Sequence, residues 1–480
     1  MKALLPTGYR LFATQFDLES MLRQVSKYSC LFLNDEKIIH FLGKKYSYTI
    51  NGRQNSVLVC QTWLIDLIYD LCCLRQTGAK SISDDETLHL INLYNIDKNK
   101  MPRISHNDIL LYAFGFMGEQ INVQTQNKLF DVYARETYIL EEISKKDNRY
   151  NLDILSIFKN ITNFDPFEYS HVLITIWAYF FQCNGTILKN NISFSFEDSV
   201  INKTNISDFL KKYSTSIENV HNSPLERQVW YSYPFIETDD AYILSNSYIA
   251  LNTFAHANYW VLRNYYLGEN SQDFINAFGE YFELYFKEVL FNCLKSSEYQ
   301  RIEETTKKRA DWIIRLFGRD IIIEQKSALA SIGIKQTDTN VQSIKDFIKR
   351  TWSKAVKQLH ETEIGYELKQ PIKIILLYED YFKCEILDEL FRIDESIEDD
   401  CRYWLVTIDE IEQFLYIYKT NPAMAQEIFE AKNKAELTKD SNGRSLEKFI
   451  EEKGITKNQY LKKFGIFKKF ERIKEKNKRL

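Results

Sequence analysis

Two short runs of β-branched residues that meet at a glycine constrain this fold more than any other segment. Residues 310–326 read ADWIIRLFGRDIIIEQK, a pattern that predicts two antiparallel strands joined by a tight turn. If Gly318 and Arg319 form the turn, Asp311 on the first strand lies opposite Lys326 on the second. The remaining pairs follow from this one, so the hairpin has a defined register.

This register sorts the side chains of the hairpin into a polar face and an apolar face. Directly opposed residues project to the same side of a sheet, and Ile313 lies opposite Glu324. One face therefore carries Asp311, Ile313, Arg315, Ile322, Glu324 and Lys326. The other face carries Trp312, Ile314, Leu316, Ile321, Ile323 and Gln325, which are nearly all apolar. A sheet with one buried face requires this sorting, and a slip of one residue would destroy it.

The polar face combines the groups that metal-assisted phosphodiester hydrolysis needs. Asp311 and Glu324 are carboxylates on neighbouring strands, within about 7 Å of each other, and oxygen ligands of this kind bind Mg²⁺ together with water and phosphate. The ammonium group of Lys326 can orient the attacking water and offset the charge that develops on the phosphate. The alternative is an exposed hairpin face with a cross-strand ion pair worth about 0.2–1 kcal/mol.

The elements around the hairpin predict an α/β core with a mixed sheet flanked by helices. A long amphipathic helix is expected over 273–295, with Ser271 as its N-cap, and a basic helix over 341–360. Two further strands are expected in PIKIILLYED (371–380) and RYWLVTIDE (402–410), with a helix from Asp409. Strands that alternate with helices are typical of such a core.

Residues 271–410 resemble the PD-(D/E)xK nuclease superfamily, which has the restriction-endonuclease-like fold. The family motif is an Asp on one strand followed by Glu-x-Lys on the next, matched here by Asp311, Glu324 and Lys326. Ala310 stands where the family usually has proline. The resemblance implies an αβββαβ-like arrangement and a nuclease that uses Mg²⁺ or Mn²⁺.

The resemblance also implies roles for residues on the two flanking helices. In the family a Glu of the preceding helix often joins the metal site, which favours Glu283 in the stretch GEYFE and leaves Glu280 as the second choice. Many relatives carry a polar residue on the following helix, and Gln358 matches that position. The same helix is basic, and its expected phosphate-binding residues are Lys345, Lys349, Arg350, Lys354 and Lys357. Each of these residues can instead belong to a solvated helix face.

The rest of the chain predicts scaffolding and recognition rather than chemistry. The expected parts are a helical N-terminal domain (1–225), a connecting hairpin and helix (226–270), the nuclease-like core (271–425) and a basic helical tail (426–480). Residues 451–480 hold eleven Lys and Arg against four Glu, a net charge of +7, with interleaved aromatic residues. That segment predicts an amphipathic helix that docks its apolar side or contacts phosphates.

Composition limits the class of protein. The formal net charge of the whole chain is −4, so any nucleic-acid surface has to be local. The eight cysteines form no CxxC pair, which favours a reduced, cytoplasmic protein, and the start of the chain lacks a signal-peptide pattern. The most apolar stretch, residues 56–74, contains Gln61, Asp66 and Asp70 and therefore predicts a buried helix and no membrane partner. No GxGxxG, GxxxxGK[ST] or GxSxG motif occurs.

The leading hypothesis is a Mg²⁺-dependent endonuclease that cuts DNA, in the setting of prokaryotic restriction or antiviral defence. Two alternatives stay open: an RNA-cleaving nuclease, and an inactive nucleic-acid or protein-binding module that keeps the fold. A homodimer or a partner protein of a defence system is compatible with this pattern. The sequence does not indicate the base specificity, the activation trigger or the role of residues 1–225.

Overall fold

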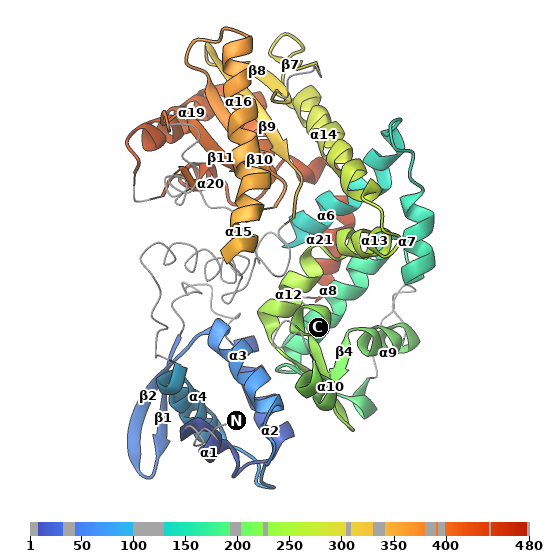
Figure 1. The fold of residues 1–480 in the computed structure, drawn as a ribbon, viewed down its shortest axis with the longest axis vertical. Coiled ribbons are helices and arrows are strands. Elements are labelled where there is room, and N and C mark those ends of the chain that lie inside the picture. The colour runs from blue at the N-terminus through green and yellow to red at the C-terminus, as the bar shows by residue number, and fades with distance from the viewer. Residues whose placement is uncertain are drawn as a thin grey trace.

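The chain forms a mixed α/β structure in which helices predominate (Figure 1). The computed structural model describes residues 8–31, 44–98, 129–192, 203–223, 229–303, 309–329, 341–379, 390–391, 399–440 and 443–477. Three sheets are present in these residues, with strand orders β1-β2, β3-β6-β5-β4 and β11-β10-β9-β8-β7. No helix in this part of the chain is long and apolar enough to cross a membrane.

The five-stranded sheet and its helices occupy one end of the molecule (Figure 1). Their elements are α14 (Asp273–Cys293), β7 (Tyr299–Arg301), β8 (Trp312–Leu316), β9 (Arg319–Lys326), α15 (Val341–Ile348), a π-helical turn (Lys349–Ser353), α16 (Lys354–Gly365), β10 (Ile372–Leu377), β11 (Tyr403–Thr407) and α18 (Ile408–Thr420). Strands β7, β8 and β9 are antiparallel neighbours, whereas β9, β10 and β11 run parallel. The helical rod from α15 to α16 makes the crossover between β9 and β10, as parallel strands require.

Both faces of this sheet are covered, so the polar residues of the hairpin lie under a helix. The face with Ile313 and Ile322 packs on Phe347, Trp352 and Leu359 of the crossover rod. The opposite face, with Trp312, Ile314 and Ile323, packs in a second core that includes α14 and α18. The predicted sorting into two faces is therefore present, but the polar face is partly buried rather than open.

The second group of elements joins the N-terminal half to this core. Its elements are α6 (Leu129–Tyr138), a π-helical turn (Ile139–Ile143), a 3₁₀ turn (Ser144–Lys146), α7 (Ile154–Thr162), α8 (Pro166–Gln182), β3 (Thr186–Leu188), a 3₁₀ turn (Lys189–Asn191), α9 (Lys203–Lys212), β4 (Ser214–Ser216), α10 (Ile217–Asn222), α11 (Val229–Ser232), β5 (Phe235–Glu237), β6 (Ala241–Leu244), α12 (Ser247–Ala255) and α13 (Ala257–Gly268). The expected hairpin near residue 239 is present, and it belongs to a four-stranded sheet with β3 and β4.

A buried cluster of charged side chains links α6 to the core that contains the five-stranded sheet. Arg135 binds Glu412 and lies 2.8 Å from Asp409, both on α18. The hydroxyl of Tyr285 on α14 donates to Glu412 over 2.6 Å. Because a buried charge that loses its partner is strongly destabilising, this group holds α6, α14 and α18 together.

The N-terminal lobe contains a β-hairpin that the sequence analysis did not predict. Its elements are α1 (Gly8–Ala13), α2 (Leu18–Leu31), β1 (Lys44–Ile50), β2 (Arg53–Val59), α3 (Gln61–Cys72) and α4 (Asp84–Lys98). The single helix expected over 56–74 is therefore wrong at its start, because residues 56–59 end a strand and the helix begins at Gln61. Val57 and Val59 are buried while Leu58 is exposed, which is the alternation of a strand.

The C-terminal segment docks through its apolar side. Its elements are α19 (Pro422–Leu437), α20 (Leu446–Glu451), a 3₁₀ turn (Leu461–Lys463) and α21 (Gly465–Asn477). Phe467, Phe470 and Ile473 of α21 are buried in the main core, and the Phe470 ring lies 6.1 Å from that of Tyr133. Within the described residues, the amphipathic helix expected in 451–480 is present only over 465–477, because residues 452–464 form turns and the 3₁₀ segment. The buried aromatic residues of α21 are used for packing.

Candidate active site

The hairpin of β8 and β9 turns one residue earlier than expected, and this changes the pairing of the site residues. Leu316 pairs with Arg319, so Phe317 and Gly318 form the turn, with φ of 52° and 73°. Two left-handed residues make the type I′ turn that suits a hairpin. The predicted turn at Gly318-Arg319 is therefore wrong, and so is the predicted pairing of Asp311 with Lys326.

The corrected register brings the two carboxylates closer together than predicted. Ile313 pairs with Ile322 instead of Glu324, and continuing the register by one residue places Asp311 opposite Glu324. The shift is two residues, and side chains alternate with a period of two, so the composition of each face is unchanged. The structure thus keeps both acids on one face and makes them direct neighbours.

Asp311 ends the ladder between the two strands. Its backbone N–H donates to the Ile323 carbonyl over 2.9 Å, and its Oδ2 accepts a hydrogen bond of 2.6 Å from the Gln325 N–H. Burial, followed by the nearby charge of Glu324, raises the pKa of Asp311 to about 8. These two causes outweigh the Gln325 hydrogen bond and the positive charges of Lys326 and Arg301. The ionised form of Asp311 is therefore disfavoured, mainly by burial, and binding of a proton or a cation relieves this cost.

Glu324, Lys326 and Gln358 form a connected group beside Asp311. Lys326 Nζ donates to Glu324 Oε1 over 2.5 Å and to Gln358 Oε1 over 3.2 Å. Gln358 Nε2 donates in turn to the Arg309 carbonyl over 2.9 Å, which fixes the side-chain amide. Burial raises the pKa of Glu324 even though the Lys326 charge opposes the rise. The predicted Glu324, Lys326 and Gln358 are thus brought together.

Helix α14 approaches the hairpin at the Glu-x-Lys segment. Gln325 clamps the two elements, because its Nε2 donates to the Phe282 carbonyl over 3.2 Å and its Oε1 accepts from Trp312 Nε1 over 2.7 Å. A Cβ atom at Gly279 would lie 3.5 Å from Ser327 Oγ, so α14 runs close to the end of β9. The sequence pattern places Gln325 on the apolar face of the hairpin and does not indicate this contact.

The two helix carboxylates differ in their surroundings. Glu283 lies 2.5 Å from Arg301 of β7, and its charge contributes to the raised pKa of Glu324. Glu280 lies 3.5 Å from Arg149 of the N-terminal half. Glu283 is therefore the helix carboxylate whose charge acts on Glu324, although it also binds an arginine. Arg301 was missed because β7 is only three residues long.

The crossover rod presents its basic residues outward. Lys345, Lys349, Arg350, Lys354 and Lys357 are all exposed. The charge of Lys354 acts on Glu324, so the stripe reaches the site. A π-helical turn over Lys349–Ser353 interrupts the rod, and such turns are frequent at functional sites. The predicted helix over 341–360 is present and continues to Gly365.

The residues present fit a hard divalent cation held by two carboxylates. Glu324 Oε2 is buried and has no hydrogen-bond partner in the described part of the chain. A buried acid oxygen without a donor is costly unless a cation or water binds it. Within the described ranges no group of three or more His, Cys, Asp or Glu side chains is close enough to hold a metal ion. A pair of carboxylates suits Mg²⁺, which keeps several waters and binds substrate phosphate.

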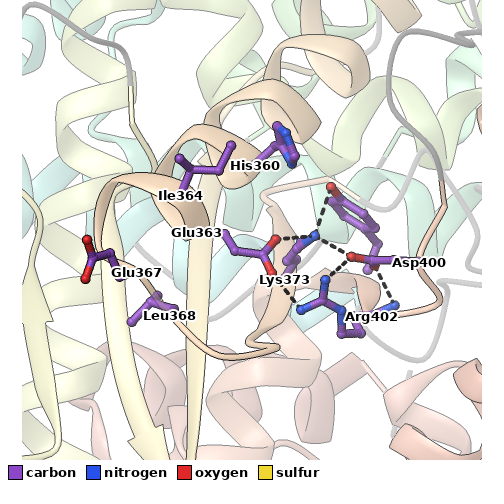
Figure 2. A pocket seen from close by; sticks show the side chains of 9 residues that line it. His360, Glu363, Ile364, Glu367, Leu368, Lys373, Asp400 and Arg402 are labelled. Atoms are coloured by element: carbon purple, nitrogen blue, oxygen red, sulfur yellow. Dashed lines mark hydrogen bonds and ion pairs between the residues drawn. The ribbon is translucent and has the colours of Figure 1, made fainter.

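A separate hollow of about 530 Å³ lies beside α16 and the start of β10 and β11 (Figure 2). Buried Lys373 lies 2.7 Å from Glu363 and 2.6 Å from Asp400. Arg402 binds the same two acids, so the four charges compensate one another. Asp311, Glu324 and Lys326 do not line it. We interpret the ion pairs that line this hollow as contacts that hold α16 against the sheet.

Comparisons of the chain with protein-family models, with curated proteins and with solved structures find no match. The resemblance to PD-(D/E)xK nucleases therefore stays a prediction from the motif. The geometry described above is independent of that resemblance.

Proposed function

We propose that this protein is a Mg²⁺-dependent endonuclease that hydrolyses DNA, with Mn²⁺ as an alternative metal. The observation that carries the proposal is the placement of Asp311 opposite Glu324, with the Lys326 amine 2.5 Å from the second acid. A binding module has no need of two adjacent buried acids with a raised pKa. The setting in prokaryotic restriction or defence stays an expectation from the resemblance.

Each residue of the site has a defined role in this proposal. Asp311 and Glu324 hold the metal, which supplies charge stabilisation to the scissile phosphate. Lys326 orients a water molecule through its Nζ and offsets charge on the phosphate. Gln358 keeps the Lys326 amine in place, and Glu283 adds negative charge beside the pair.

The basic rod supports nucleic acid as the substrate. Its five cations are exposed, and the one nearest the site, Lys354, acts on Glu324. Contacts between lysine or arginine and phosphates dominate the affinity of proteins for DNA. The five cations of the rod that would bind the phosphate backbone of DNA therefore extend to the proposed metal site.

The test is cleavage of supercoiled plasmid by the full chain with Mg²⁺ or with EDTA. We expect Glu324→Gln and Lys326→Ala each to lower the cleavage rate by about 10²-fold or more. Asp320→Asn is the matched control, because Asp320 is on the same strand face but pairs with exposed Arg315 over 3.0 Å. Equal cleavage by wild type and by folded Glu324→Gln protein would refute the assignment. Salt-sensitive DNA binding without any cleavage would favour a binding module.

A further inference from the structure

The hairpin β1–β2 of the N-terminal lobe is a two-stranded ribbon. Lys44 pairs with Val59 and Ile50 pairs with Arg53, so all seven residues of each strand are paired around an Asn51-Gly52 turn. The described chain adds no third strand to this sheet. Figure 1 shows the ribbon at the outer edge of its lobe, at the opposite end of the molecule from β7 and β8.

The inner face of the ribbon is anchored on α4. The hydroxyl of Tyr48 lies 3.2 Å from His89 Nδ1 and accepts a hydrogen bond of 3.1 Å from Asn92. Tyr48, Val57 and Val59 are buried in the N-terminal core. The ribbon is therefore held against a helix, which reduces the entropy lost when its outer face binds a partner.

The outer face carries hydrogen-bonding side chains. The exposed apolar side chain of Leu58 lies on this face as well, opposite Lys45. Lys45, Ser47, Thr49, Gln54 and Ser56 alternate along the two strands, project to one side and are exposed. Together these groups donate and accept hydrogen bonds, as the edges of base pairs do.

The charge of the ribbon has one sign. Residues 44–59 contain three basic and no acidic residues, although the chain as a whole is slightly acidic. An ordinary solvated hairpin face mixes both signs. Lys45 lies on the outer face, whereas Arg53 pairs with Ile50 on the opposite face and is exposed next to the Asn51-Gly52 turn. The ribbon therefore favours a polyanionic partner, with Lys45 facing it and Arg53 at the tip of the hairpin.

We propose that the outer face of the β1–β2 ribbon binds duplex DNA in the major groove and contacts base edges there. The major groove of B-DNA is about 12 Å wide and admits a two-stranded ribbon. The deep, narrow major groove of an RNA duplex does not, so the ribbon selects DNA over double-stranded RNA. The inference rests on the proposed action on DNA and assigns recognition to the N-terminal lobe, away from the proposed metal.

The experiment measures binding of the full chain to a mixed-sequence 30-base-pair DNA duplex in EDTA, so cleavage does not enter. We expect Lys45→Ala/Arg53→Ala to weaken DNA binding about tenfold. A plot of the logarithm of the binding constant against the logarithm of the salt concentration should lose about 1.8 in slope, because two phosphate contacts are removed. Gln54→Ala/Ser56→Ala should leave that slope unchanged and weaken binding to sequences selected by the wild type about tenfold. Lys145→Ala is the control, because Lys145 is an exposed cation on another face.

The groove is tested by methylation interference. We expect methylation of guanine N7, in the major groove, to block binding by the wild type. The same methylation should no longer affect binding by Gln54→Ala/Ser56→Ala. Unchanged affinity and salt slope in both double variants would overturn the inference and leave the nuclease proposal intact, provided plasmid cleavage persists. Equal competition by double-stranded RNA, or no DNA binding by the wild type, would also overturn it. All four substituted residues are exposed, so the variants should fold, and circular dichroism checks this.

Discussion

Metal binding at the proposed site should release a proton, because Asp311 carries one at neutral pH. Its pKa of about 8 leaves about one in eleven molecules ionised at pH 7 and about ten in eleven at pH 9. A metal that requires the ionised form therefore binds about tenfold more tightly at pH 9 than at pH 7. The difference corresponds to about 1.4 kcal/mol.

The assay is calorimetric titration of the full chain with Mn²⁺ in buffers of different ionisation enthalpy. We expect release of about one proton per metal from Asp311 at pH 7 and about a tenth of a proton at pH 9. Asp311→Asn should bind more weakly and lose this release, whereas Asp320→Asn should behave as the wild type. An affinity that does not change between pH 7 and pH 9 would refute the reasoning, because the carboxyl would then be ionised throughout.

Three further predictions follow from the same residues. In EDTA, the melting temperature of the wild type should fall by a few degrees between pH 5 and pH 8, because the raised pKa of Asp311 makes the folded state bind more protons than the unfolded state over that range. Asp311→Asn should reduce this fall, and parallel plots of melting temperature against pH for the two proteins would contradict the prediction. Gln358→Ala should lower the cleavage rate about tenfold and lower the melting temperature slightly, since it removes one partner of the Lys326 amine and one of the Arg309 carbonyl. An unchanged cleavage rate would leave Gln358 without a role. Gly318→Val should destabilise the protein by about 1–2 kcal/mol because φ is +73° there, which denaturant unfolding measures; an unchanged midpoint would argue against the turn.

The hairpin was predictable because its alternation is a local signal, whereas its register was not. The sorting of residues 311–326 into two faces depends only on the period of two, and the structure shows it. The exact pairing depends on which residues accept left-handed backbone. Phe317 does so at φ 52°, an uncommon conformation for a bulky side chain. The Phe317 ring packs 5.2 Å from Phe429 and 5.4 Å from Tyr418, and these tertiary contacts are absent from any local pattern.

Other features were missed for different reasons. The β1–β2 ribbon had a recognisable signal in Asn51-Gly52, a strong indicator of a hairpin, but the apolar run that follows it favoured a helix. Strand β7 is three residues long and carries no alternation that a sequence could reveal, so Arg301 was not assigned to the site. The bond between Gln325 and the Phe282 carbonyl depends on the approach of α14, which only the folded structure defines.

Arg301 offsets part of the negative charge that three acids on adjacent elements bring to the site. The charge of Glu324 raises the pKa of Asp311, and the charge of Glu283 raises the pKa of Glu324. Arg301 pairs with Glu283 and lowers the pKa of Asp311. Arg301 remains 44% exposed, so its guanidinium is accessible to a phosphate. A substrate phosphate that binds Arg301 would add negative charge beside the acids of the site, which would strengthen the attraction of the site for a cation. Substrate and metal should therefore bind with positive coupling, because each supplies the charge that the other leaves uncompensated.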